Sequence, residues 1–218
     1  MALIRSAFQD ELDQVSQSLV DLTNMVSESI VKASKALQTA DLNVAEEVIA
    51  TDAKIDAYQH DLDARIIDII ARQQPVASDL RALITALRMS ADLERMGDLS
   101  HHIAKVARLR HPETAIPNDL VLSFTEMGHV AEKLATKVAT VITTRDTDMA
   151  LQVEKDDDEM DELHKKVIAG ILSNTDGISI ASAVDLTLLG RYYERFADHA
   201  VAVARRVYFL VKGEFPNN

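Results

Sequence analysis

The spacing of the apolar residues is the feature that most limits what this chain can fold into. Between residues 4 and 37 an apolar side chain recurs at every third or fourth position. This spacing places the apolar residues along one side of a helix of about ten turns. The residues in the stripe are Ile4, Phe8, Leu12, Val15, Leu19, Leu22, Val26, Ile30, Ala33 and Leu37. The pattern predicts a long helix whose apolar side is covered by other helices.

Breaks in this pattern divide the rest of the chain into five further helices. Thr39–Ala40–Asp41 predicts a tight turn with a capping residue, and Gln73–Gln74–Pro75 ends the second helix. The later helices are predicted at about residues 76–110, 119–144, 146–172 and 178–211. A turn at residues 174–177 separates the last two helices. Long helices joined by short turns pack antiparallel to their neighbours, so an all-α bundle is expected.

The composition excludes several classes of protein. The chain has no Cys, which excludes disulfides, zinc ribbons and thiol chemistry. Its formal net charge of −12 argues against binding to nucleic acid or to an anionic membrane surface. No run of about 18 apolar residues is present to span a membrane. The charged N-terminal residues, Arg5, Asp10, Glu11 and Asp13, do not resemble a signal peptide, so a cytoplasmic protein is expected.

The second half of the sequence repeats the first. At a shift of 105 residues Lys32 aligns with Lys137 and Asp41 with Asp146, and at a shift of 100 residues Glu94 aligns with Glu194. Residues 111–118 contain two prolines and form the one clear linker. We therefore predict two tandem antiparallel three-helix bundles that arose by internal duplication, residues 1–111 and residues 112–218.

Each half carries two acidic pairs at a spacing of four residues. The pairs are Asp52/Asp56, Glu94/Asp98, Asp157/Asp161 and Glu194/Asp198. Two residues at this spacing lie on the same face of a helix, with Cβ atoms roughly 5–6 Å apart, and like charges there repel. The acids interrupt apolar stripes instead of occupying the most polar face, so neighbouring helices can bring two pairs together. We expect a cluster of four carboxylates in each half.

Two interpretations of these clusters remain open. Carboxylates at the edge of a core need a partner, and metal ions with a preference for oxygen ligands supply one. His101, His102 and His199 are candidate additional ligands. Alternatively, ordinary ion pairs neutralise the acids, with Arg88, Arg95, Arg191 and Arg195 as the cations. The chain has no glycine-rich phosphate loop and no serine with a nearby base in triad spacing.

The doubled acidic motif resembles the PhoU family. Residues 52–56 read D-A-K-I-D and residues 93–98 read L-E-R-M-G-D, and their counterparts are D-D-E-M-D at 157–161 and Y-E-R-F-A-D-H at 193–199. The resemblance covers nearly the whole chain. It implies a two-bundle helical protein that represses the phosphate-starvation response and links the ATPase subunit of the phosphate ABC transporter to the sensor histidine kinase. It also implies iron, zinc, manganese or magnesium at the acidic motifs, and some members form homodimers.

This sequence departs from the family pattern at two positions. Ala197 stands where members usually have Gly, and His199 has no counterpart in the first half, where Leu99 stands. The two sites are therefore expected to differ in ligand set and affinity. Two alternative functions are a ferritin-like carboxylate oxidase and a helical scaffold without a ligand. The oxidase requires Glu-x-x-His motifs, and we identify none in the chain. The nearest substitute is Asp98-x-x-His101, and its counterpart Asp198-x-x-Val201 lacks the His.

Overall fold

The structure is a computed structural model that describes residues 2–174 and 177–216. The described residues form six α-helices and one short 3₁₀ helix, with no strand. Their bounds are α1 (Ala2–Thr39), α2 (Leu42–Gln73), α3 (Ala77–Arg110), η1 (Asn118–Leu120), α4 (Val121–Thr144), α5 (Thr147–Ser173) and α6 (Ile180–Lys212). The all-α prediction is confirmed. The predicted turn at 174–177 lies partly outside the described residues.

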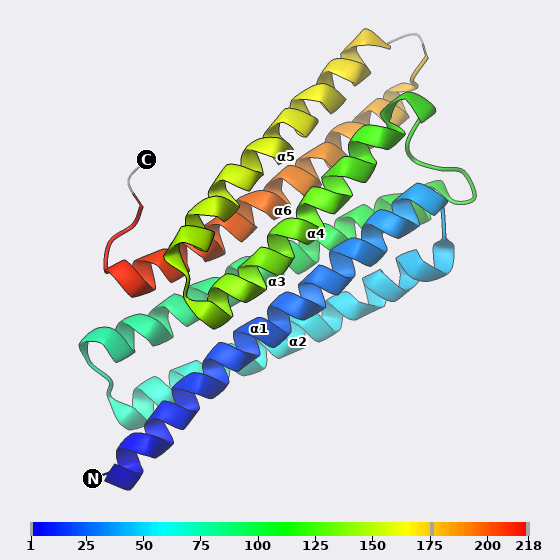
Figure 1. Cartoon of the computed structure of the whole chain (residues 1–218). Helices are drawn as coiled ribbons and strands as arrows, with labels where there is room; N and C mark the ends of the chain where they lie inside the picture. Colours follow the sequence, from blue (N-terminus) through cyan, green and yellow to red (C-terminus); the bar gives the residue numbers. More distant parts are fainter. Residues whose placement is uncertain (1, 175–176, 217–218) are drawn as a thin grey trace.

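The helices form a central group of four with one helix on each outer side (Figure 1). The central helices are α1, α3, α4 and α6, and α1 packs on α4 while α3 packs on α6. Helix α2 covers α1 and α3, and α5 covers α4 and α6 in the same way. Since the repeat equates α1 with α4 and α3 with α6, the two halves face each other about an approximate twofold axis.

The second helix of each half begins with the same kind of N-cap, an aspartate side chain. The Asp41 carboxylate accepts backbone hydrogen bonds from Asn43 and Val44 at the start of α2. Asp146 caps α5 through the equivalent amides, those of Asp148 and Met149. These caps satisfy backbone N–H groups that the first turn of a helix leaves without partners. The predicted capping role of this repeated aspartate is confirmed.

The core runs through both halves without a break. Buried apolar residues from every α-helix belong to one continuous cluster. Near its centre the Tyr193 hydroxyl on α6 lies 2.8 Å from the Ser34 hydroxyl on α1, and Tyr193 is fully buried. Gly128 on α4 permits α4 to lie close to α1 beside Ser34, because a Cβ at residue 128 would lie 3.0 Å from Ser34 Oγ. Since this core crosses the linker, the boundary between residues 1–111 and 112–218 stays a prediction.

No helix in the described part of the chain is long and apolar enough to cross a membrane. The helices are long because few glycine or proline residues interrupt them. Each helix carries polar residues on the side that faces away from the core.

The Ser34–Tyr193 hydrogen bond yields a test of how strongly the two halves are coupled. Tyr193→Phe and Ser34→Ala should each lower the free energy of unfolding by about 1–2 kcal/mol, because each leaves a buried hydroxyl without its partner. The double variant should lose much less than the sum of the two, since it leaves no orphan hydroxyl. Chemical unfolding of the four proteins measures this coupling, and additive losses would show that the contact carries no interaction energy.

Candidate functional site

The first acidic cluster forms where α2 packs against α3. One carboxylate oxygen each from Asp52, Asp56 and Asp98 lies within 4.8 Å of the others. Glu94 is not part of this group of three, but burial and the nearby charges of Asp98, Asp56 and Asp52 raise its pKa. Three of the four predicted residues are therefore close enough to share one cation.

Several oxygens of this cluster lack a protein partner. One oxygen of Asp52 and one of Asp56 are buried without a hydrogen bond. The other Asp52 oxygen contacts Nδ1 of His101, which confirms that this predicted histidine lies at the cluster. A buried carboxylate oxygen without a donor is costly. Unpartnered oxygens beside an imidazole form a donor set that suits a divalent or trivalent cation.

Gly97 sets the close approach of α2 and α3 at this cluster. A Cβ at residue 97 would lie 3.0 Å from Cγ2 of Ile55, closer than ordinary packing allows. Gly97 lies between Glu94 and Asp98 in sequence, and Ile55 precedes Asp56. A side chain at this position would therefore push apart the helices that carry the acids. This glycine gives the first half its compact group of oxygens.

The second cluster is more open than the first. Asp157 and Glu194 are partly buried and each has one buried oxygen without a hydrogen bond, whereas Asp161 and Asp198 are exposed. Among the described residues no group of three acids from this half brings its oxygens as close together as the first cluster does. Ala197 supplies the Cβ that Gly97 lacks. The two acidic clusters thus differ in structure, in line with the expected difference in their ligand sets.

Burial and mutual repulsion raise the pKa of acids in both clusters. Burial is the larger cause of the raised pKa of Asp52 and of Glu194, and neighbouring carboxylates add to it. Asp157 is affected most, with burial and the charges of Asp161, Asp198, Glu194 and Asp158 raising its pKa to about 7. Both clusters are therefore destabilised in their fully ionised form, which is the form that a bound cation would stabilise.

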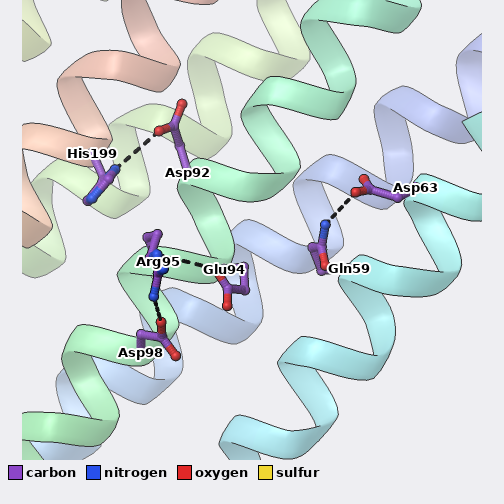
Figure 2. A network of polar contacts seen from close by, with 7 residues as sticks. All are labelled: Gln59, Asp63, Asp92, Glu94, Arg95, Asp98 and His199. Carbon is purple, nitrogen blue, oxygen red and sulfur yellow. Dashed lines mark hydrogen bonds and ion pairs between the residues drawn. The ribbon is translucent and has the colours of Figure 1, made fainter.

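The ion-pair interpretation accounts for part of each cluster. Figure 2 shows Arg95 between Glu94 and Asp98, and Arg191 pairs with Glu194 in the second half. Both arginines are exposed, so these pairs contribute little stability. Arg88 and Arg195 make no ion pair within the described ranges. Arginine therefore leaves the buried oxygens of Asp52, Asp56 and Asp157 without partners.

Two of the candidate histidines contact residues outside the acidic clusters. His102 stacks on Tyr192 of α6, with ring centroids 5.2 Å apart. His199 places Nδ1 3.1 Å from an Asp92 oxygen (Figure 2). Arg206 donates to the other Asp92 oxygen, so these contacts join α3 to α6. Because His199 faces Asp92, the interpretation of His199 as an auxiliary ligand of the second cluster is not supported.

Sequence reasoning missed two histidines. His164 lies on α5 against Gly190 of α6, and the charge of Asp161 acts on it. Its signal was the Asp161-x-x-His164 spacing. The interpretation that the chain has no Glu-x-x-His is wrong, because Glu126 and His129 form one, but both residues are exposed on α4. A carboxylate oxidase needs such ligands to project into the bundle, so this motif does not create an oxidase site.

The raised pKa of Asp157 predicts how stability depends on pH. Between about pH 4 and pH 7 the folded protein keeps a proton that the unfolded chain has lost, so this group's contribution to stability falls as the pH rises through about 7. Asp157→Asn should therefore stabilise the metal-free protein by about 1–2 kcal/mol at pH 8, after discounting for solvent, and have little effect at pH 4. Chemical unfolding in chelator across this range tests it, and a difference independent of pH would contradict it.

Comparison with known proteins shows which family shares this architecture. Residues 19–107 and 124–207 each match the PhoU domain model, and their starts and ends reproduce the 105- and 100-residue shifts of the repeat. A phosphate-specific transport system accessory protein, PhoU homolog 2 of Mycobacterium tuberculosis, is 41% identical over 213 residues, covering 98% of this chain and 100% of the relative. PhoU homolog 1 of Mycobacterium leprae is 40% identical over 215 residues, covering 99% and 97%.

Solved structures agree with these matches. The crystal structure of the phosphate transport system regulatory protein PhoU from Streptococcus pneumoniae superposes with a TM-score of 0.85 at 27% identity, covering 97% of this chain and 100% of that one. PhoU from Pseudomonas aeruginosa gives a TM-score of 0.84 at 27% identity, covering 95% and 100%. The fold, the doubled acidic motif and the end-to-end similarity show that this chain belongs to the PhoU family.

Proposed function

We propose that this protein is a cytoplasmic negative regulator of the phosphate-starvation response and of phosphate uptake. In this role it acts as an adaptor between the ATPase subunit of the phosphate ABC transporter and the sensor histidine kinase. The observation that carries the proposal is similarity over the full length to proteins named phosphate-specific transport system accessory proteins. Both repeats match the family model, and the acidic motifs occur in both, which supports the proposal.

We further propose that the two acidic clusters bind metal ions. Asp52, Asp56, Glu94 and Asp98 would hold one ion, with His101 beside them, and Asp157, Asp161, Glu194 and Asp198 would hold another. The unpartnered buried oxygens support this assignment. Iron, zinc, manganese and magnesium all accept carboxylate ligands. A bound cation would neutralise the repelling acids and join α2 to α3 or α5 to α6.

Metal binding should stabilise the folded protein. An ion that binds only the folded state at a hundredfold excess over its Kd adds about 3 kcal/mol per site. Asp98→Asn with Asp198→Asn should abolish this gain, while stability in chelator stays within about 1 kcal/mol of the parent because repulsion is also removed. Thermal melts in chelator, iron, zinc, manganese and magnesium provide the measurement.

A matched control separates the clusters from general charge effects. Asp61→Asn with Glu126→Gln removes the same charge at two exposed positions outside both clusters, and this variant should respond to metal as the parent does. A parent indifferent to every ion, together with a cluster variant that loses stability in chelator, would mean that the acids act only as partners of Arg95 and Arg191.

Deletion of the gene tests the regulatory role. In rich phosphate the deletion strain should express its phosphate-starvation genes, since the repressing adaptor is gone, and the wild-type gene should restore repression. Transcript levels of the phosphate transporter in high and low phosphate provide the readout. Expression that stays repressed after deletion would argue for the alternative of a helical scaffold without a signalling role.

The adaptor mechanism also requires physical contact. The purified protein should bind the transporter ATPase subunit, the sensor kinase, or both, by co-purification and calorimetry in high phosphate. Failure to bind either partner at any phosphate level would remove the adaptor mechanism but leave the regulatory role standing. The cluster variant tested beside the parent would show whether metal binding contributes to partner affinity.

A further inference from the structure

The C-terminal segment forms one wall of a groove on one half of the molecule. The groove, of about 430 Å³, lies between the start of α3 and the end of α6, and Leu80, Ile84 and Phe209 line it with Phe215. The Phe215 ring stacks on Phe209 with centroids 4.6 Å apart and planes 12° apart. Arg81 lies over the same Phe209 ring, 5.5 Å from its centroid. We name this site the α3 groove.

The internal repeat creates an equivalent surface on the other half. At the shift of 100 residues Leu80, Ile84 and Phe209 of the α3 groove correspond to Ile180, Val184 and Leu109. Because α3 and α6 pack on each other and are repeat equivalents, the start of α6 faces the end of α3 in the same way. Arg110 donates to Asp185, which joins the end of α3 to the first turns of α6. We name Leu109, Ile180, Val184 and Leu188 the α6 patch.

Nothing in the described chain covers the α6 patch. Ile180 is 87% exposed, Leu109 72% and Val184 52%. The segment that follows α3 cannot cover it, because Ala115 and Ile116 are buried in the core on the way to α4. The segment that follows α6 instead lies at the α3 groove, where Phe215 stacks on Phe209. Exposed apolar side chains at adjacent helical turns are a feature of binding surfaces.

The charges beside the α6 patch indicate the chemistry of its occupant. Lys105 lies one helical turn before Leu109, and Arg108 directly precedes it. Both side chains are exposed, and neither makes an ion pair among the described residues. In a chain of net charge −12, two such cations favour an acidic partner. The segment in the α3 groove already has this chemistry, because Glu214 directly precedes Phe215.

We propose that the α6 patch is a docking site for a partner protein segment that carries an aromatic residue beside a carboxylate. The aromatic ring would pack on Ile180, Val184 and Leu109 as Phe215 packs on Phe209, and the carboxylate would face Lys105 and Arg108. The patch includes none of the clustered acids, so this docking site is independent of metal binding.

Peptide titration followed by methyl NMR tests this docking site. The probe is the blocked tetrapeptide Gly-Glu-Phe-Pro, the sequence of residues 213–216, and the control peptide has Ala in place of Phe. In the parent protein the probe should shift the methyl signals of Leu109, Val184 and Leu188, and the control should not. Val184→Glu should weaken binding about tenfold or more, because it adds a charge to an apolar contact and repels the peptide carboxylate.

A matched pair of variants distinguishes the two halves. Ile84→Glu, at the position equivalent to Val184, should leave binding at the α6 patch unchanged. Phe215→Ala opens the α3 groove and should add a second binding site for the probe. Binding to the α3 groove of this variant without any shift at the α6 patch would overturn the proposal, as would no binding to either site.

Sedimentation equilibrium adds a further outcome. The parent and Val184→Glu proteins should have the same mass in solution if the patch serves a different protein. A dimeric parent together with a monomeric Val184→Glu variant would show that a second copy of this chain covers the patch, and the proposal of a separate partner would be wrong.

Discussion

The structure depends on the burial of two apolar helical faces against each other. A three-helix unit built from α1, α2 and α3 leaves an apolar face on α1 and α3, and α4 and α6 of the second unit cover it. Burying such faces is the main favourable term in folding, and close packing makes the result specific. The Ser34–Tyr193 contact shows that the fit extends to polar groups in the centre. The outer helices α2 and α5 are thereby held where only one side of each is buried.

That arrangement explains why the acidic residues gather at the α2–α3 and α5–α6 seams. An acid on the inner side of an outer helix is neither in the core nor fully in water. Its charge is therefore poorly solvated, and neighbouring acids raise the cost, as the pKa of about 7 at Asp157 illustrates. Such a seam retains unsatisfied oxygens that a cation could bind, because the arginines on the outer surface pair with other oxygens of the clusters.

The duplication also makes the small differences between the halves informative. Gly97 lets α2 approach α3 closely, whereas Ala197 carries a Cβ at the equivalent position of the other seam. The segment that follows α6 stacks Phe215 on Phe209, whereas the linker that follows α3 continues into α4. The two acidic clusters thus differ in how closely their oxygens approach one another. The α3 groove contacts the segment that follows α6, whereas the α6 patch contacts no equivalent segment among the described residues. Equivalent positions in a repeat need not have equivalent functions.

The sequence alone determined the helical class, the helix ends, the duplication and the acidic pairs, because periodicity, capping residues and turn signals are local properties. The repeated Asp41 and Asp146 caps are an example. Only the tertiary structure decided which oxygens meet, that His101 contacts Asp52, and that His199 faces Asp92. The reason is physical: a helix pattern shows which residues share a face, but the rotation of one helix against another depends on packing across the whole core.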